Sequence, residues 1–442
     1  MAFFGGSPAI HPPQAEFMYR SKWRLTVHGF RTGFLYLLFF SIPFSIAGGD
    51  FAIVGLYVVT GVLFAKKKEI RWESLPIVKG LCLYLLGAIV GTLLSDDPLT
   101  GLPYFRSFWR LGLPFLLFFA LEDEPVERYI RPMSFISILI GLYAAVQFFT
   151  GLDVLRSEYL QNRYHTFLGI WPAVGAFSHH LTFGGVFLLL FAIFAALVLS
   201  SEVDPKWRLL YALAAMVCLS SVVFCNGRSI WLGGMTVGFV FLFVLIPVKA
   251  RWAALAIAVL LAIAFWLSPR YLGETEFGKS VMGSRLLSIT LPKANRDRLM
   301  MWRAGADIVK DYPIFGLGPN MSEKMEPYYR RVAEEYRHSF HHGPGTGLHN
   351  IYLQTWVDFG LLGLLGYLWL FFSVIYAIAA QVSRSAVVKS TDHALLLGIM
   401  AGLCGNMVGG FFENNFRDGE VQIAVLTLMG IAMALLKRGA NR

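Results

Sequence analysis

Charged side chains are scarce in this sequence. Asp, Glu, Lys and Arg make up 15% of its 442 residues, whereas soluble domains carry about 25%. Hydrophobic residues account for 56% and gather in repeated runs of the length that crosses a bilayer. These features exclude an ordinary soluble domain. They predict an all-α polytopic membrane protein whose surroundings are the lipid bilayer.

Cysteine is rare as well, and metal-binding motifs are absent. Cys82, Cys218, Cys225 and Cys404 are scattered through apolar segments without a C-x-x-C spacing, so neither a disulfide framework nor a cysteine zinc site is expected. The sequence also lacks an H-E-x-x-H motif. Residues 1–24 contain no apolar stretch of the kind found in a cleavable signal peptide.

The net charge of +10 raises the question of nucleic-acid binding. The positive-inside bias of membrane proteins explains it better, so no nucleic-acid partner is expected. About 20 apolar residues cross a bilayer as a helix, and twelve such spans are predicted. They are 29–47, 50–66, 76–95, 102–121, 132–150, 180–200, 207–224, 229–247, 250–268, 349–380, 391–412 and 420–437. The tenth is too long for a simple crossing and is expected to start above the membrane or to tilt.

Lysines and arginines set the expected orientation. Arg20, Lys22 and Arg24 precede the first span, and residues 66–68 are lysines that follow the second. With twelve spans, these clusters and the basic C-terminus fall on one side, so both termini are expected in the cytoplasm.

The same count divides the chain into spans one to nine (1–268), an outer loop domain (269–348) and spans ten to twelve (349–442). The loop carries twelve Lys and Arg against nine Asp and Glu. Loops longer than about 60 residues escape the positive-inside bias, so the basic charge of this loop needs another explanation.

Two helices are predicted within the loop. Asn295 is expected to cap one that ends near Asp311. Asn320, followed by Glu323, forms a capping-box pattern for a second helix that runs to about Arg337.

Arginines concentrate on the outer side of the predicted spans. Arg228 lies in a short loop between spans seven and eight, and Arg298 shares a helix face with Trp302 in the long loop. Arg296 and Arg303 lie on the same helix. Too few acidic residues lie nearby to pair with all these cations, and the planar arginine fork suits phosphate. A polyanionic ligand is therefore predicted, with interfacial anchoring and a solvated helix as the alternatives.

His349 opens the tenth span, beside Asn350. The helix N-terminus and the arginines both disfavour a charged imidazole, so we expect a neutral ring that can accept a proton from a hydroxyl group. Asn350 is expected to orient the ligand or the ring, and the glycines of 343–347 to let the backbone approach a substrate. The alternatives are a structural histidine or a zinc site with His341 and His342, which the cationic surroundings oppose.

Arginine within a span is also a hypothesis of function. Arg106 and Arg110 lie four residues apart in the fourth span, and Arg106 is the nearer to the outer face, where it could contact phosphate. Snorkelling or pairing with another span is the alternative. With Lys79, these residues could instead line the pathway of a secondary transporter, but no inverted repeat supports that class.

Several motifs occur in the order typical of a known superfamily. The first is Asn226-Gly-Arg228-Ser-Ile-Trp231-Leu-Gly233, followed by Arg298-Leu-Met-Met-Trp302, Asp311-Tyr-Pro313-Ile-Phe-Gly316-Leu-Gly318-Pro319-Asn320, His349-Asn350-Ile-Tyr352-Leu353 and Gly360-Leu-Leu-Gly363. This set resembles the O-antigen ligase and Wzy-type polymerase superfamily. One departure is Gly227, where the family often has serine.

The resemblance implies a GT-C-like fold with a periplasmic loop domain in the bacterial inner membrane. It implies an inverting, metal-independent glycosyltransferase without a cofactor, which moves O-antigen from undecaprenyl pyrophosphate to the lipid A core. Arg228 and Arg298 would hold the pyrophosphate, and His349 would act as the base. Ligase is favoured over a Wzy-type polymerase, and a transferase that glycosylates protein is a further alternative.

Overall fold

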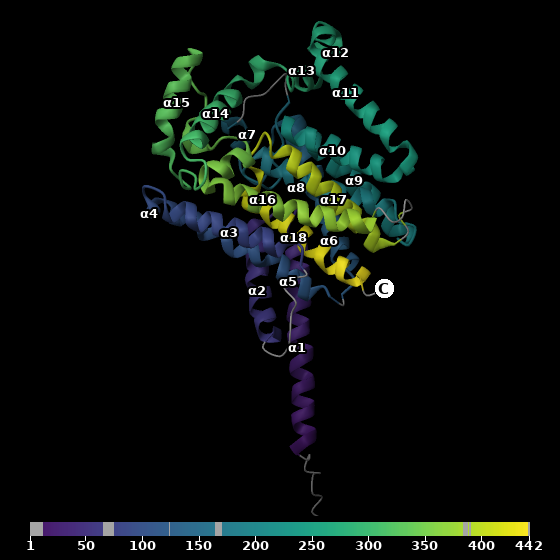
Figure 1. Ribbon diagram of the computed structural model, residues 1–442. Coiled ribbons are helices and arrows are strands. Elements are labelled where there is room, and N and C mark those ends of the chain that lie inside the picture. Colours follow the sequence, from purple (N-terminus) through teal and green to yellow (C-terminus); the bar gives the residue numbers. More distant parts are fainter. Residues whose placement is uncertain are drawn as a thin grey trace, which may run out of the picture.

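The computed structural model describes residues 12–64, 75–122, 124–163, 170–382, 388 and 390–440. Helices form the regular structure of these residues, and no strand occurs among them. The all-α architecture is confirmed. Figure 1 shows a bundle of long helices, with α11 to α15 gathered at one end and α1 and α2 at the opposite end.

Helices overlap all the predicted spans, although the helix in the first span begins earlier than predicted and the α-helix in the fourth is only eight residues long. These helices are α1 (Pro12–Ser41), α2 (Ile46–Phe64), α3 (Ile77–Leu93), α5 (Leu113–Ala120), α6 (Glu127–Thr150), α8 (His180–Val198), α9 (Pro205–Phe224), α10 (Arg228–Leu245), α11 (Arg251–Leu272), α16 (Ile351–Val382), α17 (Thr391–Gly409) and α18 (Gly419–Ala440). Among the described residues, eight helices are long and apolar enough to cross a membrane, namely α6, α8 to α11 and α16 to α18. The helices α2 and α3 are apolar but shorter. A polytopic membrane protein is confirmed, and the count of twelve spans stays a prediction.

The fourth predicted span is not a continuous α-helix. After the short α4 (Pro98–Gly101), residues Leu102–Gly112 form a 3₁₀ helix, η2, and only then does α5 begin. Pro114 stands in the first turn of α5. Its missing N–H costs nothing at a helix start, but an α-helix that continued through this position from residues 102–112 would lack one hydrogen bond. Residues 102–120 are therefore helical, as predicted, but only the second part is an α-helix, because proline breaks the hydrogen-bond ladder.

The tenth span is long because it contains a break. Gly360 has φ +67° inside α16, so two helical pieces join there. The backbone N–H of Leu361 donates to the carbonyl of Ile314 at 3.0 Å, and a Cβ on Gly360 would lie 2.0 Å from that oxygen. The turn that follows α14 therefore docks into the break, and glycine is required for it. This break is one reason for the length, and the expected start above the membrane or tilt stays a prediction.

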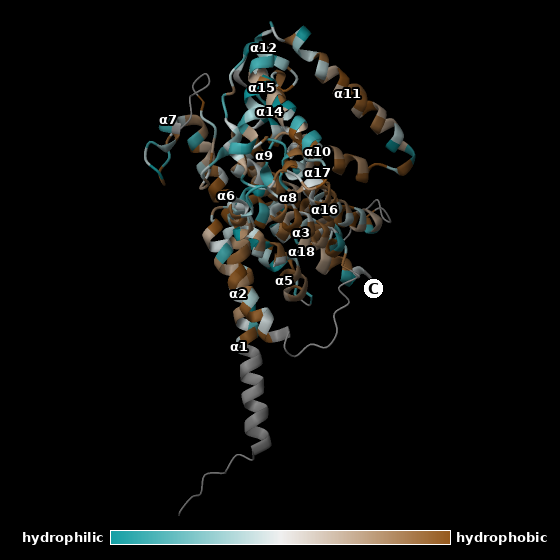
Figure 2. Cartoon of the chain, turned by 60° about the vertical axis from the view of Figure 1, so that its left-hand side comes forward, coloured by the Kyte–Doolittle hydropathy of each residue, from teal (hydrophilic) through white to brown (hydrophobic). Residues whose placement is uncertain are grey.

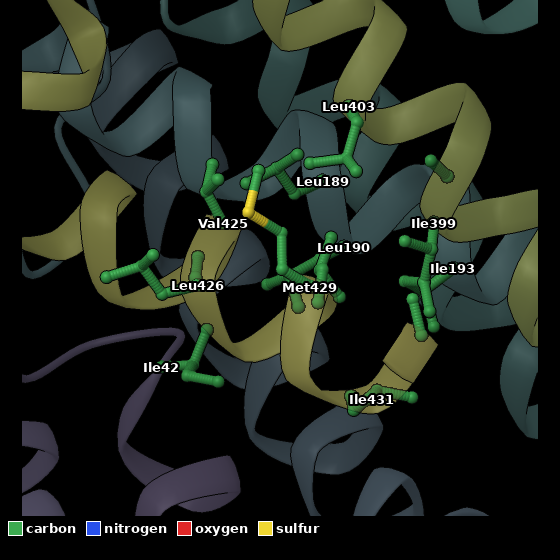
Figure 3. Packing of buried hydrophobic residues seen from close by; sticks show 14 of the residues in the cluster. Ile42, Leu189, Leu190, Ile193, Ile399, Leu403, Val425, Leu426, Met429 and Ile431 are labelled. Atoms are coloured by element: carbon green, nitrogen blue, oxygen red, sulfur yellow. The ribbon is translucent and has the colours of Figure 1, made fainter. Parts of the chain in front are cut away.

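The centre of the bundle is formed by α8, α17 and α18, whose apolar windows are 78%, 78% and 83% buried. Figure 3 shows leucine, isoleucine and valine side chains from these three helices meeting around Met429. By contrast, none of the window of α11 is buried, and Figures 1 and 2 show α11 standing apart from the bundle. An apolar helix of this kind is one that faces lipid.

The long loop between α11 and α16 contains α12 (Glu276–Lys279), α13 (Val281–Leu287), α14 (Pro292–Asp311) and α15 (Ser322–Tyr336). Figure 2 shows hydrophilic ribbon concentrated around α12, α14 and α15. The apolar faces of α14 and α15 share a small core of their own, which includes Met301, Ile308, Met325 and Tyr329. This packing holds α14 in place above the membrane helices.

Both predicted helix caps in this loop were wrong. The helix α14 begins at Pro292, and the Asn295 amide donates backwards to the carbonyls of Ile289 and Leu291, at 2.8 and 3.0 Å. Asn320 has φ +62° and donates to the carbonyl of Thr100 at 3.4 Å instead of capping α15. Asparagine side chains can cap a helix N-terminus or stabilise a turn. Here both asparagines donate to carbonyl groups of nearby segments instead of capping the helices.

Candidate functional site

A buried carboxylate joins the predicted histidine to one of the predicted arginines. Glu413 lies between α17 and α18, and its side chain is 9% exposed. One carboxylate oxygen, Oε1, accepts a hydrogen bond from Nη2 of Arg298. The other, Oε2, lies 3.0 Å from Nδ1 of His349. Residues from three distant parts of the chain therefore meet at one point.

The backbone around His349 is held in a specific conformation. His349 has φ +46°, an uncommon value for a residue other than glycine. Asn350 then caps α16, since its Oδ1 accepts from the N–H groups of Tyr352 and Leu353 at 3.1 and 3.0 Å. The N–H of Asn350 itself donates to Oδ1 of Asn414 at 3.1 Å. The loop carrying His349 is thus tied to the segment carrying Glu413.

A second network of side-chain hydrogen bonds connects the same two segments. Gln354 accepts from the N–H of Leu348 at 2.8 Å and donates to Asp358 at 2.8 Å. Asp358 pairs with Arg417 at 3.2 Å. The Arg417 guanidinium lies over the ring of Tyr104, 4.6 Å from its centroid. Each of these buried polar groups has a partner within the network, as a rigid site requires.

Arg228 is the first residue of α10 and follows a tight loop in which Asn226 has φ +54°. Its guanidinium donates to the carbonyl of Ser288 at 2.9 Å and to that of Ala294 at 3.2 Å, and so anchors the connection between α13 and α14. Arg228 also interacts electrostatically with Arg298. Like charges held together in a partly buried place favour an anionic ligand.

The electrostatics of Glu413 fix the proton arrangement of the pair. Burial alone would raise the pKa of the Glu413 carboxyl, but the hydrogen bond from His349 and the positive charge of Arg298 outweigh it, so that this pKa is lowered. An ionised carboxylate can only accept hydrogen bonds. The His349 ring must then donate from Nδ1, which leaves Nε2 as the nitrogen that can accept a proton.

Of the other predicted site residues, Trp302 lies close to this cluster. Its ring centroid is 5.8 Å from that of Phe412, the residue before Glu413. Trp302 and Asn350 line one end of an apolar groove of about 670 Å³, a size within the range of ligand sites. The groove continues between α16 and α17, where it is lined by Leu364, Leu368, Phe372, Ile375, Cys404 and Phe411.

The remaining predicted arginines lie elsewhere. Arg303 is 43% exposed and pairs with Asp307 at 3.7 Å and Glu335 at 3.9 Å, between α14 and α15. Arg296 and Arg106 are exposed. Within the described part of the chain, neither of them has a hydrogen bond or ion pair to the cluster.

Glu413 is the residue that the sequence analysis missed. A weak signal was present, because an acidic residue and two asparagines, 413–415, interrupt two apolar spans. His180, which the motifs left without a role, lies with Nδ1 2.6 Å from the carbonyl of Cys225 and so supports the Arg228 loop. No group of three or more metal-ligating side chains is found in the described ranges.

Fold and site together define a polytopic helical membrane protein with arginines beside a histidine–carboxylate pair. Arginine side chains suit a polyanion, and a neutral histidine suits proton transfer. Residues 212–368 match the model of the O-antigen ligase family, and this stretch contains Arg228, Arg298 and His349. The match confirms the resemblance seen in the motifs. It supports a function of the ligase or polymerase type, and members of this family are glycosyltransferase-like enzymes. No curated protein matches the chain.

Proposed function

We propose that this protein is an O-antigen ligase. It transfers O-antigen polysaccharide from undecaprenyl pyrophosphate to a sugar of the lipid A core, by an inverting reaction that needs no metal. The observation that carries the proposal is the meeting of Arg298 and His349 on Glu413, with the like-charged Arg228 within electrostatic range of Arg298. The enzyme resides in the bacterial inner membrane, with the site on the periplasmic face and both termini in the cytoplasm.

The reaction is a single displacement. A hydroxyl oxygen of the acceptor attacks the anomeric carbon of the donor, and the bond from that carbon to the pyrophosphate oxygen breaks. The hydroxyl proton passes to Nε2 of His349, a step typically worth about 10²–10⁴-fold in rate. Arg228 and Arg298 stabilise the charge that builds on the departing pyrophosphate, and each preorganised donor of this kind contributes about 3–4 kcal/mol. Attack from the opposite side inverts the anomeric configuration.

The apolar groove supports a lipid-linked donor. Trp302 and Asn350 stand where the groove meets the cluster, so a polyprenyl tail seated between α16 and α17 would present its pyrophosphate to Arg298. An apolar chain gains roughly 0.8 kcal/mol for each buried CH₂ group. The groove would therefore hold and orient the donor before the reaction.

A transporter fits the structure less well. Arg110, one of the intramembrane cations that would line a pathway, forms a bidentate pair with Asp50 at 2.7 and 2.6 Å. A cation held in this way serves helix packing and is not available to a moving solute. A Wzy-type polymerase or a protein glycosyltransferase would use the same donor chemistry and differ in the acceptor.

The test is transfer from purified donor lipid to three acceptors: lipid A core, free repeat units on the carrier lipid, and a protein. Ligase activity predicts transfer to lipid A core only. Arg228→Ala, His349→Ala and Arg298→Lys should lose most activity, the last because lysine cannot bind phosphate bidentately. Arg330→Ala, an exposed arginine of α15, is the matched control. Activity in EDTA should be unchanged, and activity that EDTA abolishes and a divalent ion restores would refute the metal-free account.

A further inference from the structure

A polar chamber of about 480 Å³ lies against His349. It is lined by residues just before and at the start of α8, by Ile230 of α10, by residues of the segment 413–420 and by the end of the long loop. Arg228 and Arg298 are not among its lining residues, and neither is Trp302. His349 therefore contacts this chamber, while the arginine cluster and the apolar groove lie outside it. Since the base must touch the attacked hydroxyl, the chamber is where that hydroxyl would approach.

The lining of the chamber is rich in hydrogen-bond acceptors. Glu413, Asp418 and Glu420 contribute carboxylates, and Asn415 contributes an amide. Asn415 is only 5% exposed, and its amide nitrogen is bound to Asn406 at 3.1 and 2.8 Å. Its Oδ1 has no hydrogen-bond partner among the described residues. A buried acceptor without a partner is rare, and a donor on a bound molecule would satisfy it.

The charges of this chamber do not cancel. Arg417, which lines it, is already paired with Asp358. Asp418 accepts from the hydroxyl of Thr182 at 2.8 Å, which is a neutral donor, and Glu420 forms no ion pair with the described residues. Burial, together with the like charges of Glu420 and Glu413, raises the pKa of Asp418 to about 6. The lining thus carries the carboxylates of Asp418 and Glu420 without an ion pair among the described residues, although the Arg417 charge also acts on Asp418.

We infer that this chamber holds the acceptor sugar by its hydroxyl groups, and that its carboxylates exclude an acceptor with a phosphate or carboxylate beside the attacked hydroxyl. Sugar hydroxyls are donors that match carboxylate and amide oxygens. A phosphate offers hydrogen-bond acceptors and would face carboxylates of like charge. This repulsion lowers the affinity for such an acceptor by at least about tenfold. The inference rests on the proposed transferase function and adds the chemical class of the acceptor residue.

The experiment compares two acceptors with the full-length enzyme: a lipid A core ending in a neutral hexose, and the same core with a phosphate monoester on that hexose. We expect the neutral acceptor to have at least about a tenfold higher kcat/KM. Glu420→Gln should raise KM for the neutral acceptor by about tenfold, the effect of one lost hydrogen bond to a charged group, and leave the donor KM unchanged. Glu420→Lys should reverse the preference between the acceptors.

The control is Glu323→Gln, which removes one exposed carboxylate of α15 that is not among the residues lining the chamber, and it should alter neither KM. The inference is overturned if the wild-type enzyme uses both acceptors equally, or if the Glu420 variants change the donor KM and not the acceptor KM. An enzyme that transfers to neither acceptor would instead refute the ligase assignment itself.

Discussion

Replacing Glu413 by glutamine tests whether the buried carboxylate positions the histidine base. Glutamine has nearly the same shape but no charge, so it weakens the contacts to His349 and Arg298 while filling the same space. A hydrogen bond to a charged group is worth about 1.5–3 kcal/mol. With about 1.4 kcal/mol for each factor of ten, loss of this bond predicts a fall in kcat of about 10- to 150-fold.

The direction of the KM change separates positioning from general damage. In the wild-type enzyme the carboxylate holds the Arg298 guanidinium, so its removal leaves that arginine more available to the pyrophosphate. We therefore expect the donor KM to stay constant or to fall while kcat drops. The assay is steady-state transfer in detergent or proteoliposomes, with Glu413→Asp as the conservative variant that recovers part of kcat. A Glu413→Gln enzyme with wild-type kcat, or one impaired only through a higher donor KM, would refute the reasoning.

The pH dependence of stability gives a second measure of the same charge. Because the pKa of Glu413 is lowered in the folded protein, the folded state binds its proton less readily than the unfolded state. The stability it contributes is present above the ordinary glutamate pKa and is lost as pH falls through the folded value. The wild-type unfolding temperature should thus decrease more between pH 5 and pH 3 than that of Glu413→Gln.

Two further predictions concern the framework of the site. Asp418 should affect the pH dependence of stability in the opposite direction to Glu413, since the pKa of Asp418 is raised to about 6. Its contribution falls as pH rises from about 4 to about 6, by up to about 3 kcal/mol, and Asp418→Asn should remove that decline in thermal unfolding curves. Gly360→Ala should destabilise the protein by roughly 1–3 kcal/mol, because φ is positive there and the new Cβ would meet the Ile314 carbonyl. In the same unfolding assay Gly238→Ala, whose Cβ meets nothing within 4 Å, should cause no loss, and an equal effect of both alanines would contradict this account of α16.

The positions of the catalytic candidates were only partly readable from the sequence. The motifs placed Arg228, Arg298 and His349 on one side of the membrane, and the structure brings Arg298 and His349 onto one carboxylate. Trp302 and Asn350 lie beside them, at the end of the apolar groove. Arg303 shares the helix of Arg298 but faces α15, because residues five apart on a helix point in different directions. Helical phase, read from a firm helix start, would have separated these two arginines.

The sequence by itself determined the membrane helices. In a bilayer no water is present to hydrogen-bond the backbone N–H and C=O groups of an apolar run of about 20 residues. Such a run must therefore form a helix, whatever the arrangement of the rest of the chain. This local rule placed α6, α8 to α11 and α16 to α18 without any knowledge of packing. It failed at Gly360, where the docked turn after α14 supplies the hydrogen bond that breaks the helix.

Only the tertiary structure decided the composition of the site. Glu413 lies 115 residues from Arg298 and 64 from His349 in sequence, and no local pattern relates residues at such separations. Their meeting depends on how α14, α16 and the segment between α17 and α18 pack together. Hydrophobic periodicity states that a segment is buried, but the partner of a buried charge is fixed by where the folded chain places a second charge.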